Sequence, residues 1–258
     1  MLGRDVVRVA GAGAVALTHA ELDVTDAVAV RHALAGAGAG TVVNCAAYTN
    51  VDGAESEPEL ALQVNRDGAR NVADAAERVL YVSSDYVFDG AKRDPYLESD
   101  ATGPLQAYGR SKLAGEEATA EANPRHFIVR SSWLFGRGGA NFVETMLRVG
   151  RERGHARVVD DQVGSPTFTG HLAEALVALA ATDDYGVHHM ASSGWCSWFE
   201  FAREIFERAG VACDLEPSTT ADYPLPAVRP AWSVLGSERG HRLPTWREGL
   251  ATYLGARA

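Results

Sequence analysis

The stretch Val79-Leu80-Tyr81-Val82-Ser83-Ser84-Asp85-Tyr86-Val87-Phe88 decides the fold of this chain. Four apolar or aromatic side chains in a row lead into two hydroxyl side chains and an acid. A short, unbroken apolar run predicts a strand buried on both faces, since a strand with one wet face would alternate apolar and polar residues. The polar residues after it then lie at the carboxyl end of the strand, where open α/β sheets bind their ligands.

Comparable segments recur on both sides of this strand. Further strands are predicted at Thr41–Ala47 and His126–Arg130, and a shorter apolar run at Val15–Leu17 follows glycine-rich sequence. The helical segments between them are Ala27–Leu34 with Asp26 as a candidate N-cap, Pro58–Val64, Asp67–Glu77 and Ser111–Glu121. This alternation of strand and helix predicts an α/β protein with a Rossmann-type, doubly wound parallel sheet.

The second half of the chain is less regular and is predicted to form a smaller C-terminal substrate-binding lobe. The expected elements are helices at Asn141–Arg153, His171–Ala181 and Trp198–Ala209, a strand at Val187–Met190, and loop or extended chain across the proline-rich run Pro217–Pro230. We expect the nucleotide-binding domain to comprise residues 1–133 and about 166–191. The lobe would then comprise about 134–165 and 192–258.

Composition narrows the classes of function. The chain has 258 residues and a formal net charge of −10, which disfavours binding to nucleic acid or to an anionic membrane surface. No apolar run approaches the length of a membrane-spanning helix, and the first residues do not read as a signal peptide, so a cytoplasmic protein is expected. Cys45, Cys196 and Cys213 are too far apart in sequence to indicate a structural zinc site, and no metal ligand is assigned.

The segment Tyr108-Gly109-Arg110-Ser111-Lys112 carries the main indication of chemistry. A tyrosine and a lysine four residues apart share one face of a helix. A free tyrosine has a pKa of about 10, and a neighbouring ammonium lowers that pKa because it favours the phenolate. The pair therefore predicts a general acid for a carbonyl that accepts hydride. On its own, this spacing occurs by chance in many helices and more often marks a surface pair.

Two strand ends supply residues that would complete such a site. A hydroxyl of Ser83-Ser84 can hydrogen-bond a substrate carbonyl while Tyr108 protonates it, although these serines alone would more often be a turn cap. The small residues in Asn44-Cys45-Ala46-Ala47-Tyr48-Thr49 allow a dinucleotide to approach the backbone, and plain close packing is the alternative. A strand-end serine about 25 residues before Tyr-x-x-x-Lys matches the Ser/Tyr/Lys arrangement of short-chain dehydrogenases.

Over nearly its whole length the chain resembles the dTDP-4-dehydrorhamnose reductases of the extended short-chain dehydrogenase/reductase family. The matching segments are Ala20–Asp26, Val43–Thr49, Glu55–Pro58, Ser84–Gly90, Tyr108–Glu116, Arg130–Gly136, Asn141–Val143, Asp160–Thr167, Arg229–Pro230 and Leu243–Trp246. The most family-specific of them is Asp160–Thr167, which reads DDQVGSPT. Ordered matches at this density are far more specific than any single motif.

The resemblance implies a reaction and a cofactor. A hydride from NADPH or NADH would pass to C4 of dTDP-4-dehydro-6-deoxy-L-mannose and give dTDP-L-rhamnose, for the biosynthesis of cell-surface polysaccharide. The implied binding partner is a dTDP-sugar, with neither nucleic acid nor a membrane involved, and a homodimer is compatible with the family. Some family members bind magnesium at a dimer interface, but the ligands of that ion are not placed in this sequence.

The resemblance also implies roles for particular residues. Tyr108 would be the proton donor, Lys112 would lower its pKa and hold the nicotinamide ribose, and Ser84 would take a hydroxyl position where many members have threonine. The implied cofactor-binding residues, besides Tyr108 and Lys112, are Gly3, Asp23, Val24, Ala46, Ala47, Tyr48 and Thr49. The implied substrate-side residues are Asp85, Trp133, Gln162 and Arg229; loop hydrogen bonding is the alternative for Gln162, and a surface charge for Arg229.

The beginning of the chain departs from the family pattern. The resemblance implies a first strand and a Gly-x-x-Gly-x-x-Gly turn, of which only the third glycine has a match, in Gly3. Roughly ten residues of strand and turn would be missing, so we expect that the start has been assigned to an internal methionine. The run Ala10–Ala14 does not replace the turn, because a helix should precede it and a strand should follow it.

Two other functions remain open at this point. One is a different nucleotide-sugar reductase or an epimerase of the same fold, because the sequence of the lobe does not identify the sugar. The other is a non-catalytic regulatory subunit, a role that a relative of this family has for methionine adenosyltransferase. The presence of Ser84, Tyr108 and Lys112 together favours catalysis over a binding role.

Overall fold

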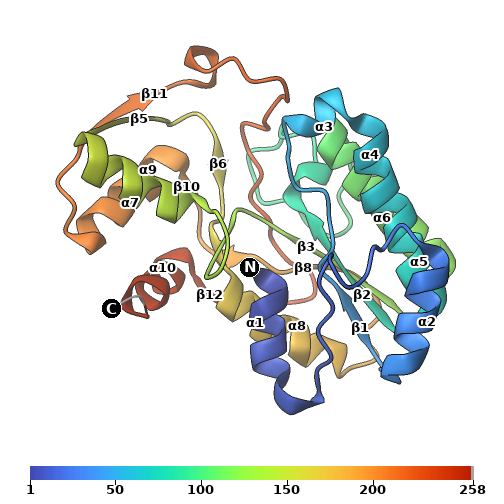
Figure 1. Cartoon of the computed structure of the whole chain (residues 1–258). Coiled ribbons are helices and arrows are strands. Elements are labelled where there is room, and N and C mark those ends of the chain that lie inside the picture. The colour runs from blue at the N-terminus through green and yellow to red at the C-terminus, as the bar shows by residue number, and fades with distance from the viewer. Residues whose placement is uncertain (257–258) are drawn as a thin grey trace.

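A four-stranded parallel sheet forms the centre of the larger part of the molecule (Figure 1). The computed structural model describes residues 1–256. The strands are β1 (Val42–Asn44), β2 (Val79–Ser84), β3 (His126–Ser131) and β8 (Gly186–His189), in the order β1-β2-β3-β8. Each neighbouring pair is parallel, and the register places Ser84 beside Ser131 at the carboxyl edge. The predicted α/β fold with a parallel central sheet is confirmed.

Helices cover both faces of this sheet, because its strands are apolar on both sides. The covering helices are α1 (Leu2–Ala10) and α8 (Thr169–Ala180) on one face, and α2 (Ala27–Ala37), α5 (Gly68–Ala75) and α6 (Ala107–Ala122) on the other, with α3 (Gly53–Ser56) and α4 (Pro58–Leu62) beside α6. Leu2 and Val6 of α1 share a buried cluster with Leu80 and Phe127 of the sheet. The sheet is therefore wound on both faces.

Two boundaries differ from the prediction, and a hydrogen bond to a side chain explains the first of them. β1 ends at Asn44 rather than at Ala47, because the Asn44 side chain accepts from the Ala46 N–H at 3.0 Å and turns the chain out of the sheet. The two helices predicted at 58–64 and 67–77 are joined by a π-helical segment, Gln63–Asp67. The predicted helix over 198–209 has the expected bounds.

The strand expected at Val15–Leu17 is not formed. The segment has no regular structure, and Val15 is 65% exposed. A strand is stable only when its backbone N–H and C=O groups pair with a neighbour. Within the described residues β1 is an outer strand of the sheet, and nothing pairs with Val15–Leu17. The helix expected before the Ala10–Ala14 run is present as α1, whereas the strand expected after the run is absent.

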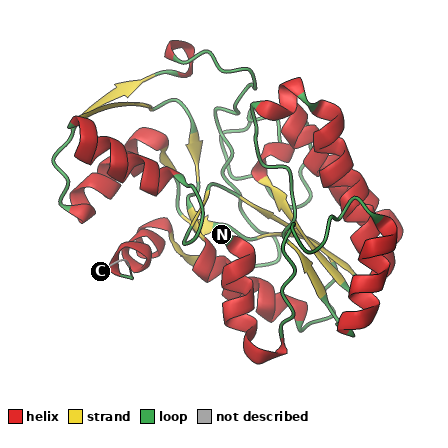
Figure 2. Cartoon of the chain, viewed as in Figure 1, coloured by secondary structure: helices red, strands yellow, loops and turns green. Residues whose placement is uncertain are grey.

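Three helices and a pair of strands form a smaller lobe around an aromatic core (Figure 2). They are α7 (Phe142–Arg153), α9 (Trp198–Ala209), α10 (Trp246–Gly255), β5 (His155–Val159) and β11 (Asp214–Ser218). Side-chain caps from Asn141, Ser197 and Thr245 begin the three helices by accepting from their first N–H groups. Of the proline-rich run, Pro217 lies inside β11 and the rest is extended chain with one short turn.

Short strand pairs tie together the segments that cross between the sheet and the lobe. They are β4 (Leu134–Phe135) with β7 (Thr167–Phe168), β6 (Val163–Gly164) with β10 (Cys196–Ser197), and β9 (Ser192–Ser193) with β12 (Leu243–Thr245). The exact division of the chain into two domains stays a prediction. Across residues 1–256, none of the helices combines the length and the apolar character needed to cross a membrane.

A buried ion pair holds α6 on the sheet. The Glu116 carboxylate accepts from the guanidinium of Arg130, on β3, at 2.7 and 2.9 Å. It also accepts from the hydroxyl of Ser83, on β2, at 2.5 Å. The ion-pair side chains are only 6% and 4% exposed, so neither charge is solvated by bulk water. The helix that carries Tyr108 is therefore fixed against the strand that carries Ser84.

Two glycines of α6 allow this close approach to the sheet. A Cβ atom at Gly115 would lie 2.2 Å from the backbone oxygen of Asn65. A Cβ atom at Gly109 would lie 2.1 Å from the backbone oxygen of Tyr86. Both distances are far below a van der Waals contact, and backbone atoms cannot swing aside. Any larger residue at these positions would push the helix away from the π-helical segment and from the turn that follows β2.

Replacement of Glu116 by alanine tests this anchor. The change leaves the Arg130 charge buried without its partner, and breaking a buried ion pair costs about 3–5 kcal/mol. We expect the free energy of unfolding, measured by urea denaturation, to fall by that amount. The matched control is Glu117→Ala, on the exposed side of the same helix, which should change it by less than about 0.5 kcal/mol. Equal losses in the two variants would contradict the anchoring role.

Candidate active site

The three residues predicted to be catalytic lie at the carboxyl end of β2. Ser84 is the last residue of that strand, while Tyr108 and Lys112 belong to the first two turns of α6. The Ser84 hydroxyl is close enough to the Tyr108 phenol to lower its pKa. The sheet and the helix thus bring together a hydroxyl, a phenol and an amine that are separated in the sequence.

The position of Tyr108 depends on where α6 begins. The Gln106 side chain is buried and accepts from the Gly109 N–H at 3.1 Å, as an N-cap residue does. The Glu55 carboxylate accepts from the Ala107 N–H at 2.7 Å. Because both caps act before Ser111, the helix starts four residues earlier than predicted and includes Tyr108 in its first turn.

The electrostatic environment of Tyr108 differs from the one expected. Burial raises its pKa to about 12, the hydrogen bond with Ser84 opposes that rise, and the charge of Asp85 adds to it. We expected Lys112 to lower this pKa, but the burial effect dominates. In this structure Tyr108 therefore holds its proton firmly at neutral pH.

The Lys112 side chain reaches the sheet. Its Nζ donates to the backbone oxygen of Val82 at 2.8 Å and lies 4.1 Å from the centre of the Tyr81 ring. Burial lowers the pKa of Lys112 to about 7, although the nearby Glu116 carboxylate favours the charged form. The ammonium is thus close to titrating at neutral pH, which is the environment of a group that can exchange a proton.

Asp85, predicted on the substrate side, is buried directly after Ser84. Its carboxylate accepts from the Ser84 hydroxyl at 3.0 Å. Burial raises the pKa of Asp85 to about 7, and hydrogen bonds from Ser233 and Ser84 offset only part of that rise. A second group that titrates near neutral pH therefore stands beside the Ser84–Tyr108 pair.

Asn65 was not recognised from the sequence, yet it links the elements of the site. It lies in the π-helical segment and is fully buried. Its side chain accepts from the Tyr48 N–H at 2.9 Å, donates to the Tyr48 oxygen at 3.1 Å, and donates to the Ser111 hydroxyl of α6 at 2.8 Å. Single π turns are frequent at functional sites. The partners of Asn65 are 17 and 46 residues away in sequence, so no local pattern indicated it.

One group of predicted cofactor-binding residues lies where α1 meets the end of β1. A Cβ atom at Gly3 would lie 3.6 Å from the Cβ of Cys45, next to Ala46–Thr49. The first N–H groups of α1 have no side-chain cap, and such groups favour a phosphate. Ala46 and Thr49 are exposed, and Ala46 and Ala47 have small side chains. These features fit a dinucleotide that runs along the backbone.

Asp23 and Val24, also predicted to bind the cofactor, lie before α2 instead. The Asp23 carboxylate accepts from the Thr25 N–H at 2.9 Å and from its hydroxyl at 2.8 Å, and these bonds lower the pKa of Asp23. Val24 packs on α5, where a Cβ at Gly68 would lie 2.6 Å from it. Asp23 remains exposed, so its side chain is open to a ligand.

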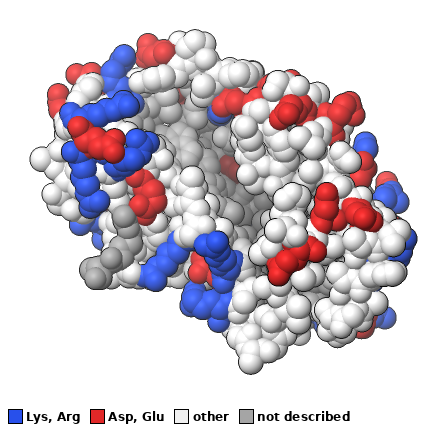
Figure 3. Space-filling view, in the orientation of Figure 1, with Lys and Arg blue, Asp and Glu red and all other residues white. Residues whose placement is uncertain are grey.

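A cleft of about 580 Å³ opens between the sheet and the lobe, and the space-filling view shows the surface hollowed there (Figure 3). Its lining residues include Tyr86, Phe142, Gln162, Trp198, Thr220, Tyr223, Leu225 and Arg229. The structure therefore brings the predicted substrate residues Gln162 and Arg229 into one cleft. Gln162 donates to the Thr220 hydroxyl at 3.0 Å, so its side chain is held at the wall.

Trp133 forms part of the same region through a stack of two indoles. Its ring lies parallel to that of Trp198, with centroids 3.5 Å apart and an interplanar angle of 1°. Gly164 makes room for it, because a Cβ there would lie 2.5 Å from the Trp133 ring. Trp133 has a φ of 48°, and no other described non-glycine residue has a positive φ. Such strain is typical of functional sites. Trp198 was not recognised from the sequence.

Arg229 is held by a carboxylate that was also missed. Its guanidinium donates to both oxygens of Asp52 at 2.6 Å, and these hydrogen bonds lower the pKa of Asp52. Asp52 accepts from the Ala227 N–H at 3.1 Å as well. The pair joins the loop after β1 to the chain that borders the cleft. The Arg229 side chain is only 14% exposed, so it lines the cleft and is not a freely solvated surface charge.

Comparison with known proteins gives consistent matches. The family model described as the RmlD substrate binding domain matches residues 1–257. A dTDP-4-dehydrorhamnose reductase of Streptomyces griseus is 44% identical, covering 93% of this chain and 83% of the relative. A probable dTDP-4,6-dihydroxy-2-methyloxan-3-one 4-ketoreductase of Streptomyces antibioticus is 40% identical, covering 97% and 90%. The crystal structure of a Bacillus anthracis dTDP-4-dehydrorhamnose reductase with NADP has 39% identity and a TM-score of 0.91, covering 93% and 89%.

The raised pKa of Asp85 predicts a pH-dependent stability. A carboxyl group whose pKa is higher in the folded than in the unfolded state stabilises the fold at low pH, and that contribution is lost as the pH rises through about 7. A rise from about 3.9 to about 7 corresponds to about 4 kcal/mol. We expect the difference in unfolding free energy between the native chain and Asp85→Asn to shift by that amount from about pH 4 to pH 8. Urea denaturation at the two pH values measures it, and a constant difference would refute the buried, neutral carboxyl.

Proposed function

The chain belongs to the RmlD substrate binding domain family, and from this membership we propose that it is a dTDP-4-dehydrorhamnose reductase. It reduces dTDP-4-dehydro-6-deoxy-L-mannose to dTDP-L-rhamnose with NADPH or NADH. The reaction supplies dTDP-rhamnose for polysaccharide biosynthesis. The homodimer and the cytoplasmic location stay predictions.

One observation carries this proposal: Ser84, at the end of β2, and Tyr108, in the first turn of α6, lie together at the strand end that borders the cleft. A ketone oxygen placed between two hydroxyl groups is polarised by both. Tyr86, between them in sequence, lines the cleft, so the pair is next to the space that a sugar would fill.

A bound nicotinamide supplies the hydride that adds to C4 of the sugar. Tyr108 gives its proton to the C4 oxygen, so that the ketone becomes a hydroxyl group and the phenol becomes a phenolate. Ser84 donates a hydrogen bond to the same oxygen and orients it. A pKa of about 12 keeps the proton on Tyr108 until the oxygen has become the stronger base. Lys112 then stabilises the phenolate by its positive charge.

The cleft walls suit the two ends of a nucleotide sugar. The stacked indoles of Trp133 and Trp198 offer an apolar surface to the deoxysugar. Arg229 offers a guanidinium to the diphosphate, because Asp52 and the Ala227 carbonyl use three of its five N–H donors and hold it in place. Ala46–Thr49 and Gly3 would hold the nicotinamide nucleotide at the neighbouring strand end.

A second candidate within the enzymes is reduction of a different 4-keto sugar. The observation in its favour is the similarity to the Streptomyces antibioticus ketoreductase, whose printed substrate differs from dTDP-4-dehydrorhamnose. A panel of dTDP-4-keto sugars, compared by kcat/KM, decides between the two. A non-catalytic regulatory subunit would turn over none of them.

Replacement of Tyr108 by phenylalanine tests the proton donor. The variant keeps the ring but has no proton to give, and general acid catalysis contributes about 10²–10⁴-fold. We expect kcat for reduction of the 4-keto sugar to fall by about that factor, followed as NADPH oxidation. Binding of NADPH and of dTDP should be almost unchanged.

The control for this variant is Tyr223→Phe, which removes a phenol that lines the same cleft but lies far from Ser84 in the sequence. It should keep kcat near the native value. If Tyr108→Phe and native chains reduce the sugar equally fast, Tyr108 is not the proton donor. If neither turns over any 4-keto sugar, the chain is a binding protein.

Replacement of Arg229 by glutamine tests the diphosphate contact. Loss of a charge-assisted hydrogen bond costs about 1.5–3 kcal/mol, which corresponds to about 10–100-fold in affinity. We expect KM for the dTDP-sugar to rise by that factor, with KM for NADPH unchanged. Arg110→Gln, at an exposed position of α6, should leave both constants unchanged. An unaltered KM for the sugar in Arg229→Gln would remove this arginine from the substrate site.

A further inference from the structure

Asp184, His188 and His241 bring three metal-ligating atoms together outside the reaction site. The Nδ1 atom of His188 lies 2.9 Å from the Nε2 atom of His241. The ligand atoms of all three side chains lie within 4.8 Å of one another. Asp184 comes just before β8 and His188 lies within it, whereas His241 follows 53 residues after His188. This separation explains why the spacing of histidines in the sequence did not indicate the cluster.

The orientation of the His188 ring is fixed by the backbone. Its Nε2 atom lies 2.8 Å from the carbonyl oxygen of Asp184, which can only accept, so Nε2 carries the hydrogen. The Nδ1 atom is left with a lone pair that points at His241. Metal-binding histidines commonly donate their other ring N–H to a carbonyl in this way.

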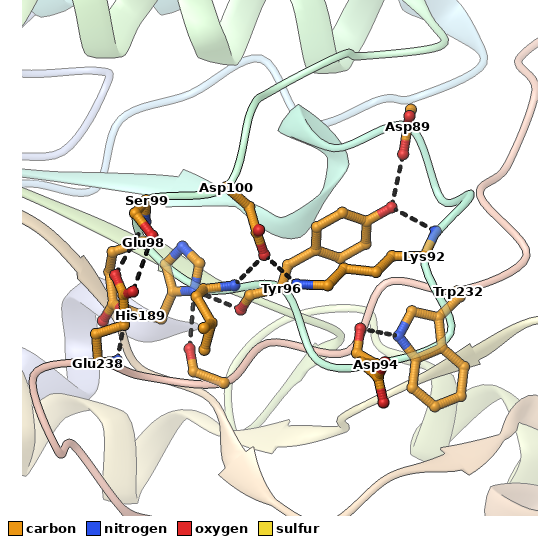
Figure 4. Close-up of polar contacts among 12 residues, drawn as sticks. Asp89, Lys92, Asp94, Tyr96, Glu98, Ser99, Asp100, His189, Trp232 and Glu238 are labelled. Carbon is orange, nitrogen blue, oxygen red and sulfur yellow. Dashed lines mark hydrogen bonds and ion pairs between the residues drawn. The ribbon is translucent and has the colours of Figure 1, made fainter.

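The segment that leads to His241 is attached to β8 by other contacts. Figure 4 shows the Glu98 carboxylate between His189 and the chain at Glu238. Glu98 accepts from the His189 N–H at 3.0 Å, from the Ser237 hydroxyl at 2.7 Å and from the Glu238 N–H at 2.7 Å. These bonds do not involve His188, so they position His241 before any ion arrives. A preorganised site binds an ion more tightly, because its side chains lose little conformational entropy on binding.

We propose that Asp184, His188 and His241 bind a divalent transition-metal ion of the Zn²⁺ type, with water as the fourth ligand. Two imidazole nitrogens and one carboxylate oxygen suit such an ion, whereas Mg²⁺ and Ca²⁺ prefer oxygen ligands alone. Zn–N bonds of about 2.0–2.1 Å need the two nitrogens slightly farther apart than 2.9 Å, so the rings separate a little on binding. The ion ties residues 236–241 to β8.

Arg239 moderates the affinity of this site. Its guanidinium donates to the Asp184 carboxylate at 2.5 Å, which places a positive charge beside the proposed site. That charge repels a bound cation. Replacement of Arg239 by glutamine removes that repulsion and frees a carboxylate oxygen. The Arg239→Gln variant therefore binds the metal more tightly than the native chain.

The test is a titration of the metal-free full-length chain with Co²⁺ and with Zn²⁺. We expect one Co²⁺ per chain with the visible absorption of a four-coordinate nitrogen and oxygen site, and its displacement by Zn²⁺. Because only the folded chain has the site, Zn²⁺ should raise Tm by about 5 °C. His241→Gln and Asp184→Asn should each weaken binding at least about tenfold, and Arg239→Gln should strengthen it.

The matched control is His155→Gln. His155 lies with Asp214 and Glu216 in a second cluster of metal-ligating side chains, on the exposed surface of β5 and β11. This variant should bind like the native chain. Binding that survives in His241→Gln, or that disappears in His155→Gln, would overturn the proposal, as would the absence of a Co²⁺ absorption band. All variants change surface or half-buried residues, so each is expected to remain folded.

Discussion

The buried ion pair between Glu116 and Arg130 is the constraint on which the rest of the site depends. It fixes α6 against β2 and β3, and the Ser83 hydroxyl completes it. Tyr108, Lys112 and Glu116 follow one another at intervals of four residues, so the helix face that is anchored is also the face that carries the phenol. Burial of a charged pair costs desolvation free energy, and the attraction between the charges offsets that cost only in a narrow range of geometries. It gives the phenol a single position relative to Ser84.

Burial, more than any single neighbouring charge, sets the proton affinities of the site. It raises the pKa of Tyr108 to about 12 and of Asp85 to about 7, and lowers that of Lys112 to about 7. Each group is therefore biased toward its neutral form in the same enclosed volume. The Tyr108 hydroxyl and the Asp85 carboxyl therefore keep their protons until negative charge develops on a substrate oxygen.

The sequence predicted the parts of the molecule that depend on local pattern. Continuous apolar runs located β2 and β3, and the Tyr-x-x-x-Lys spacing located the phenol and amine. Features that depend on distant partners were missed: Asn65 meets Ser111 46 residues away, and Asp52 meets Arg229 177 residues away. The strand expected at Val15–Leu17 does not form, for a related reason. A strand needs a neighbouring strand to pair with, and a local sequence pattern does not show whether one is present. The pKa of Tyr108 is raised by burial, which the spacing of Tyr108 and Lys112 could not show.

The central claim is that this chain transfers a hydride to C4 of a dTDP-4-keto-6-deoxysugar while Tyr108 supplies the proton. Incubation of the full chain with dTDP-4-dehydrorhamnose and NADPH that carries deuterium at both C4 positions, followed by mass spectrometry and NMR of the sugar nucleotide, tests it most directly. The account predicts dTDP-L-rhamnose that carries one deuterium, at C4. Unchanged keto sugar, or a product without deuterium at C4, would contradict it.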